Sequence, residues 1–198
     1  MTLFDIEIPV TNVRIEARAE KTKIKKEMKL LLRNENCSNL IKIAGGFPKE
    51  GEIVQFVSDG ASDTGGFFSA LLEEFGEIDE MYLSTWTISM QNVKRLIDAY
   101  DERKLKSLYF LINDGLLKTN STKAIWGAIN DLFSQRGIKY KAVNSHAKIF
   151  CCRIGENYIT ISGSGNWSEN PRIENYIIIG GKATFDFNKK WMLEKINY

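Results

Sequence analysis

The sequence predicts an α/β fold in which a mixed β-sheet carries helices on both of its faces. Apolar runs rich in β-formers alternate along the chain with segments of helical spacing, and several short strands follow one another near the C-terminus. The first pattern is typical of parallel strands joined by helices, and the second of antiparallel hairpins. The 198 residues, 43% of them hydrophobic, can bury one core, so we expect a single domain over residues 1–198.

Two strand–helix steps are predicted in the middle of the chain. Residues 79–89 are rich in β-formers, and apolar side chains follow at helical spacing over 93–100. A second apolar run, 105–113, ends in an Asn-Asp-Gly turn and precedes a helical stripe over 125–133. Gly137 is expected to cap that second helix at its C-terminal end.

The other elements are expected on either side of these steps. Further strands are predicted over 138–143, 146–154, 158–162 and 174–179, with a hairpin turn at 155–157 and a final helix over 187–196. Before the first step, Asp63-Thr64 is expected to begin a helix that reaches Gly76.

The first sixty residues are poorly assigned and are treated as a basic extension of the same domain. Residues 4–8 alternate like a strand, and residues 20–33 have a helical composition with a lysine-rich face. That face has two interpretations, a solvated helix face, which is the commoner case, or a surface that contacts nucleic-acid phosphates.

Composition narrows the class of protein. The net charge of +2 does not by itself indicate a polyanionic partner. No apolar run is long enough to span a membrane and no signal peptide is visible, so we expect a cytoplasmic protein without a membrane partner. Cys37, Cys151 and Cys152 are expected to be small buried hydrophobes. One histidine and no Cys-x-x-Cys spacing leave too few ligands for a metal, and no cofactor is expected.

The only histidine, His146, stands two residues before Lys148 in a predicted strand, so both side chains are expected on the same face. A glycine loop at residues 162–168, Ser-Gly-Ser-Gly-Asn-Trp-Ser, follows the next strand. Imidazole is a nucleophile that is neutral near pH 7, while an ammonium and an amide can neutralise phosphate oxygens. Separately, the histidine could be a core residue, the lysine an edge-strand charge and the loop an ordinary turn; together they predict a phosphate site.

This order of motifs resembles the phospholipase D superfamily: H-x-K, a turn, a strand ending in G-S-x-N, and a later acidic residue. The matching positions are His146, Lys148, Gly163, Ser164, Asn166 and Glu174. The resemblance covers the last third of the chain closely and implies a phospholipase D-like α-β-α sandwich. Arg153 departs from it, because the motif has an aspartate there; strand alternation puts residue 153 on the face opposite His146.

The resemblance also implies a role for each residue. The catalytic set is His146, Lys148, Asn166, Ser164 and Glu174, the last by holding the imidazole. Substrate binding is expected at Gly163, Gly165, Trp167 and Ser168, where the glycines would allow positive backbone dihedrals and Trp167 could touch a base or sugar. The other tryptophans, Trp86, Trp126 and Trp191, are expected in the core.

The implied function is a metal-independent phosphodiesterase. Superfamily members use two histidines, and a chain with one motif copy therefore implies a homodimer with one shared site. Compact single-motif members are nucleases, which favours an endonuclease that cleaves DNA, rather than RNA, through a phosphohistidine. Two alternatives stay open: a degenerate nucleic-acid-binding or assembly protein, and a phosphatidyl or other phosphodiester transferase.

Overall fold

A computed structural model describes residues 37–58, 63–118, 120–169 and 172–197. The strand predicted at 4–8 and the lysine-rich helix at 20–33 lie outside these residues. The elements are, in chain order, α2 (Cys37–Ile43), β1 (Ile53–Ser58), α3 (Gly65–Phe75), β2 (Glu80–Thr85), α4 (Met90–Asp101), β3 (Leu108–Asn113), the 3-10 helix η1 (Asp114–Leu117), α5 (Asn120–Gln135), β4 (Lys139–Val143), β5 (Ile149–Ile154), β6 (Asn157–Gly163), β7 (Glu174–Gly180) and α6 (Lys182–Asn197).

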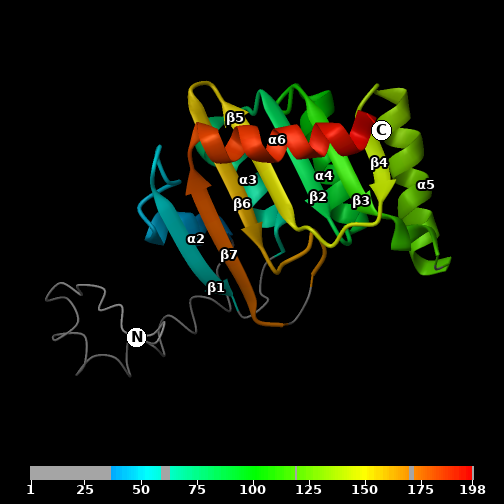
Figure 1. The fold of residues 1–198 in the computed structure, drawn as a ribbon, viewed down its shortest axis with the longest axis horizontal. Helices are drawn as coiled ribbons and strands as arrows, with labels where there is room; N and C mark the ends of the chain where they lie inside the picture. The colour runs from blue at the N-terminus through cyan, green and yellow to red at the C-terminus, as the bar shows by residue number, and fades with distance from the viewer. Residues whose placement is uncertain (1–36, 59–62, 119, 170–171, 198) are drawn as a thin grey trace, which may run out of the picture.

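The strands form one seven-stranded sheet in the order β1-β7-β6-β5-β2-β3-β4. Strands β2, β3 and β4 run parallel to one another, and every other neighbouring pair is antiparallel. Helix α6 crosses one face of the sheet, and α3 and α4 lie behind the other face (Figure 1). The predicted mixed sheet with helices on both faces is therefore confirmed.

Two hydrophobic cores lie on the two faces of the sheet. The larger core joins the sheet to α2, α3, α4 and α5, and the smaller one joins it to α6. Adjacent residues of β5 supply both cores, because Cys152 points into the larger core and Cys151 into the smaller. Cys37, Cys151 and Cys152 are buried and free, as expected, and burial raises the pKa of the Cys151 and Cys152 thiols.

Local signals in the sequence mark several boundaries correctly. Ser89 caps α4 by accepting a hydrogen bond from Asn92 N at 3.2 Å. Gly137 follows α5 with a φ of +65°, and Gly155 has a φ of +55° in the β5–β6 hairpin. The strand predicted over 79–89 is too long, since β2 ends at Thr85 and the chain turns there before α4.

The sequence does not predict α2 or β1. Strand β1 is an edge strand, and both Ile53 and Val57 are exposed on it, so its apolar positions do not report burial. None of the helices in the described ranges is long and apolar enough to cross a membrane.

Candidate active site

The predicted site residues come together at one end of the sheet. Because β5 is antiparallel to β2 and β6, its first residues lie at the end where β2 and β6 finish. His146 and Lys148 precede β5, and the glycine loop follows β6. Glu174 begins β7, which runs antiparallel to β6 and so starts at the same end. Loops at the carboxyl ends of strands are a common place for a site in α/β proteins.

His146 and Lys148 lie before β5 and not inside it, because the strand begins at Ile149. The connecting backbone is nevertheless held to the sheet: Gly163 N donates to Lys148 O at 3.3 Å, and Ser84 Oγ donates to Ala147 O at 3.4 Å. The two side chains meet as expected. Lys148 Nζ lies 3.2 Å from His146 Nδ1 and 3.3 Å from Nε2, and it also donates to His146 O at 3.2 Å.

Lys148 is a half-buried cation beside an exposed imidazole. Partial burial lowers the pKa of its ammonium, and the negative charge of Glu174 acts in the opposite direction. Glu174, at the start of β7, is therefore close enough to Lys148 for its charge to affect the pKa of the ammonium. A cation held next to the histidine would attract an anionic oxygen to it.

Glu174 is buried, with 5% of its surface exposed, and Ser164 Oγ donates a hydrogen bond to its Oε2. Ser164 is in turn held by the next residue of β7: Asn175 N donates to Ser164 Oγ, and Ser164 N donates to Asn175 O, both at 2.9 Å. The serine and the carboxylate thus form one unit. The expected role of Glu174 in holding the imidazole stays a prediction.

The two loop glycines are required for close packing. Neither Gly163 nor Gly165 has a positive φ, so the expected positive dihedrals are wrong. A Cβ at Gly163 would lie 2.0 Å from Asn175 O, and one at Gly165 would lie 2.0 Å from the Tyr176 hydroxyl oxygen. Both glycines therefore let the loop lie directly against β7, which fixes the position of the residues between them and beyond.

Residues at the N-terminal ends of α3 and α4 form hydrogen bonds with the same loop. Thr64 Oγ1 donates to Gly165 O at 2.8 Å, and Thr64 N donates to Asn166 O at 3.0 Å. Thr64 therefore does not cap α3 with its side chain; Asp63 Oδ1 accepts from Gly66 N at 3.2 Å instead. From α4, Asn92 Nδ2 donates to Trp167 O at 2.8 Å. The loop is held rigidly before any ligand arrives.

Asn166 presents its amide within this rigid loop. Its Oδ1 is buried and has no hydrogen-bond partner among the residues that the structure describes. A buried amide group without a partner is uncommon in proteins and points to an unmet interaction. The side-chain oxygen of Asn166 is thus not used to hold the loop, unlike the hydroxyl of Thr64 and the amide of Asn92.

Two expected substrate contacts are replaced by contacts within the protein. Trp167 is 1% exposed and packs between Phe68 and Phe150, with ring centroids 5.9 and 5.4 Å away, so it belongs to the core and cannot touch a base. Ser168 Oγ lies 2.6 Å from Thr87 Oγ1 and joins the loop to the turn after β2. After Asn166, the contacts of Trp167 and Ser168 hold the loop to the rest of the protein.

The structure adds two residues to the site. Trp86, expected in the core, is 41% exposed and stands edge-to-face with His146 at a centroid distance of 4.6 Å. Asn113, at the end of β3, donates from Nδ2 to Ser145 O at 2.8 Å and so fixes the backbone before His146. A possible signal for both was their place where apolar runs end, since side chains at the carboxyl ends of strands collect at one edge.

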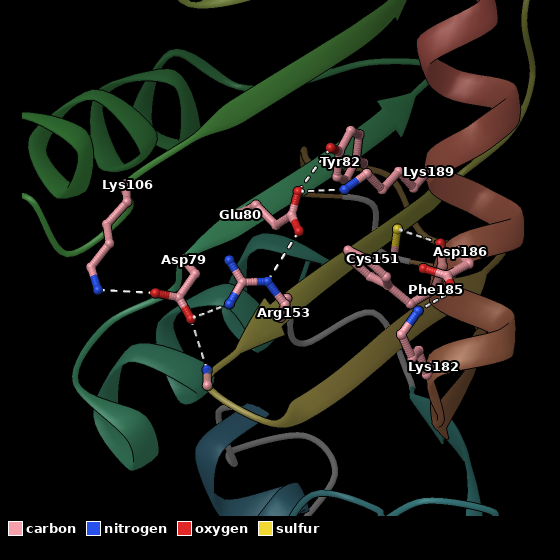
Figure 2. A network of polar contacts seen from close by, with 11 residues as sticks. Asp79, Glu80, Tyr82, Lys106, Cys151, Arg153, Lys182, Phe185, Asp186 and Lys189 are labelled. Carbon is pink, nitrogen blue, oxygen red and sulfur yellow. Dashed lines mark hydrogen bonds and ion pairs between the residues drawn. The ribbon is translucent and has the colours of Figure 1, made fainter.

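Arg153, the departure from the motif, lies at the other end of β5. Its guanidinium pairs with Asp79 at 3.0 Å and with Glu80 at 3.1 Å, and Glu80 also pairs with Lys189 of α6 at 2.9 Å (Figure 2). Lys106 completes the network by pairing with Asp79 at 2.9 Å. The arginine thus belongs to a closed set of ion pairs and not to the histidine site.

Within the described part of the chain, no group of three or more histidine, cysteine, aspartate or glutamate side chains is arranged to hold a metal ion.

No family model matches the sequence, and no curated protein matches it significantly. Similar solved structures include TrmBL2, an archaeal chromatin protein, with a TM-score of 0.51 and 16% identity over 92% of this chain and 62% of that chain. Polyphosphate kinase from Porphyromonas gingivalis has a TM-score of 0.51 and 13% identity over 85% of this chain and 28% of its own. NucT from Helicobacter pylori has a TM-score of 0.49 and 15% identity over 73% of this chain and 96% of its own.

At these identities the likeness is one of fold. The chain spans less than two thirds of both the TrmBL2 chain and the polyphosphate kinase chain. TrmBL2 and polyphosphate kinase agree with the expected architecture, and the chain has a phospholipase D-like α/β sandwich fold.

Proposed function

We propose that this chain is a phosphodiesterase that cleaves nucleic acid with His146 as the nucleophile. The observation that carries the proposal is the contact between the Lys148 ammonium and the His146 ring, 3.2 Å from Nδ1, at the end of the sheet that also holds the glycine loop. The imidazole is exposed next to the cation, and the loop that carries Asn166 lies at the same end of the sheet, which supports a phosphate site there.

The proposed reaction has two displacement steps. A ring nitrogen of His146 attacks phosphorus, a P–N bond forms, and the P–O bond to the leaving strand breaks while a second histidine gives its proton to that oxygen. Lys148 and Asn166 neutralise the non-bridging oxygens. Water then attacks phosphorus, the P–N bond breaks, and the proton of the water returns to the second histidine. Ser164 and Glu174 form one hydrogen-bonded unit, and the charge of Glu174 favours the protonated form of Lys148.

The second histidine requires a second chain, because the sequence holds one histidine. We infer a two-fold dimer in which the partner's His146 supplies the proton. Exposed apolar side chains at this end of the sheet support the inference: Met90 begins α4, Leu117 ends η1, and Ile173 precedes β7. Burial of these side chains between two chains would stabilise such a dimer.

DNA is the proposed substrate. TrmBL2, whose fold this chain shares over 92% of its length, is described as binding DNA. The loop that carries Asn166 is held by hydrogen bonds and His146 is exposed, and both properties suit a diester within a chain.

The deciding experiment is cleavage of single-stranded and plasmid DNA in EDTA by the wild-type chain and by His146→Ala. We expect cleavage by the wild type and none by the variant, with equal thermal midpoints for the two proteins. Acid-quenched wild-type reactions should contain substrate attached to His146. Cleavage that requires magnesium would contradict the mechanism, and DNA binding without cleavage would leave only a binding protein. Cleavage of lipid headgroups with DNA untouched would indicate a transferase or lipase.

The dimer has its own test. Light scattering should give the mass of two chains, and adding an excess of His146→Ala to the wild type should lower activity below the simple dilution. A monomer with full activity would contradict the shared site.

A further inference from the structure

Trp86 is set apart from the other tryptophans by its surroundings. Trp167 is buried in the core, and Trp126 and Trp191 are half-buried against it, with Trp191 Nε1 donating to Asn188 Oδ1 at 2.9 Å. Trp86 is 41% exposed, and among the described residues its ring stands against that of His146. A large apolar ring that is exposed beside a reactive group is a candidate for ligand binding, because burial of an indole is strongly favourable.

The turn that carries Trp86 is held in place. Thr85 Oγ1 donates to Thr87 O at 2.9 Å, and Trp167 N donates to the same carbonyl at 3.2 Å. Thr87 is also bonded to Ser168. The backbone on either side of Trp86 is thus tied to the loop that holds Asn166, which fixes the point from which the indole extends to His146. A backbone that is already held adds little ordering cost when a planar ligand binds.

The ligand must be compatible with the chemistry next to it. A phosphate bound at His146 and Lys148 carries a sugar and a base on each side when the substrate is a nucleic acid. The indole stands 4.6 Å from the imidazole centroid, within the span of one nucleotide. Aromatic side chains that receive successive bases by stacking are the usual way to bind single strands. A choline headgroup can also bind an aromatic ring through its ammonium, but its binding would not depend on the bases that the test below removes.

We propose that Trp86 forms a stacking subsite for an unpaired nucleobase next to the scissile phosphate. The inference rests on the proposed function and narrows its substrate to single strands or to unpaired ends. In a duplex both faces of a base are already stacked on neighbours, so only an unstacked base can lie on the indole.

The test compares Trp86→Ala and Trp86→Phe on two oligonucleotides of equal length, one with all bases and one with abasic sugars on both sides of a single cleavable linkage. For the intact strand, Trp86→Ala should raise KM by about 5- to 150-fold, the range expected for the loss of one stacked base. On the abasic strand, Trp86→Ala should lower kcat/KM clearly less than on the intact strand, because the base that would stack on the indole is missing there. Trp86→Phe should restore most of the affinity for the intact strand.

The matched control is Phe187→Ala. Phe187 is also an exposed aromatic residue, 70% accessible, but it lies on α6, which crosses the sheet away from the loops of the site (Figure 1). This control should leave both substrates unaffected.

A binding measurement needs no turnover. Single-stranded DNA should quench the tryptophan fluorescence of His146→Ala, and the double variant His146→Ala/Trp86→Phe should lose that quenching. If Trp86→Ala lowers kcat/KM equally on both substrates, Trp86 only supports His146 and the inference is overturned. An unchanged kcat/KM on both substrates would overturn it as well. A wild-type chain that cleaves neither substrate would reject the proposed function, whereas the quenching would still decide whether Trp86 binds a base.

Discussion

The two ends of strand β5 have opposite electrostatic designs. At the Ile149 end, the chain leaves an exposed imidazole and a half-buried ammonium, and the loop after β6 adds the Asn166 amide oxygen, which has no partner among the described residues. After Cys152, Arg153 is paired with Asp79 and Glu80, and both carboxylates have further cationic partners. At the first end, these polar groups are left without ion-pair partners in the ranges that the structure describes. At the other end, the charged groups pair with one another and stabilise the fold.

The pKa values express the same difference. The pKa of Asp79 is lowered by the hydrogen bond from Lys106 and by that from Gly155 N. Burial alone would raise the pKa of Glu80, but hydrogen bonds from Lys189 and Arg153 lower it overall. At the other end, burial lowers the pKa of Lys148, so the charged form is disfavoured there. The paired carboxylates at the Arg153 end stabilise the fold. The partly buried ammonium of Lys148 would instead be stabilised by a bound anion.

This comparison explains the departure at Arg153. The position is five residues beyond Lys148 and at the far end of the strand, in the ion-pair network of Figure 2. Replacing the motif aspartate by arginine therefore removes no group from the surroundings of His146. The departure does not support a degenerate site.

The largest effect is expected from removing a phosphate-binding group at the His146 end. Lys148→Ala and Asn166→Ala should each lower kcat by about a hundredfold or more, as for the loss of one oxyanion donor. Thermal midpoints should stay close to that of the wild type. Lys139→Ala, which removes an exposed lysine at the start of β4, is the control and should keep full activity. Full rates in both site variants would place the site elsewhere.

A smaller effect on stability is expected at the Arg153 end. Arg153→Ala should lower the free energy of unfolding by about 1–2 kcal/mol, because it leaves two partly buried carboxylates with fewer partners. Activity per folded molecule should not change. Urea denaturation measures this, with Lys42→Ala as the control, since the exposed pair of Lys42 with Glu73 should contribute little. A loss of activity without a loss of stability would put Arg153 in the site after all.

The smallest effect is a shift in pH dependence. Lys148 must be protonated to neutralise phosphate, and its pKa is lowered from 10.5, so kcat/KM should fall as pH rises through a value below 10.5. Glu174→Gln removes the charge that raises this pKa and should move the alkaline limb to lower pH, provided the variant keeps measurable turnover. Lys148→Arg should move it upward, because a guanidinium stays protonated. An alkaline limb that is the same in all three proteins would mean that Lys148 does not titrate in catalysis.

The sequence alone was sufficient for the sandwich and for the residues that meet at its end. Alternation of apolar runs and turn residues marks strands β2 to β7, because their side chains enter two cores. The H-x-K and G-S-x-N motifs can be recognised from the spacing of their residues in the sequence alone. It could not identify β1, whose apolar side chains stay exposed at an edge, or α2. It also placed His146 inside a strand that begins three residues later.

Only the tertiary structure decided which tryptophan faces the site and which end of the sheet holds Arg153. Trp86 and Trp167 both stand beside strand ends in the sequence, yet one lies against His146 and the other between Phe68 and Phe150. The glycines at 163 and 165 are needed because β7 passes against them, a contact with residues about ten positions away. Composition and local spacing determine what each segment can form, whereas exposure and partners depend on contacts between segments that are distant in the chain.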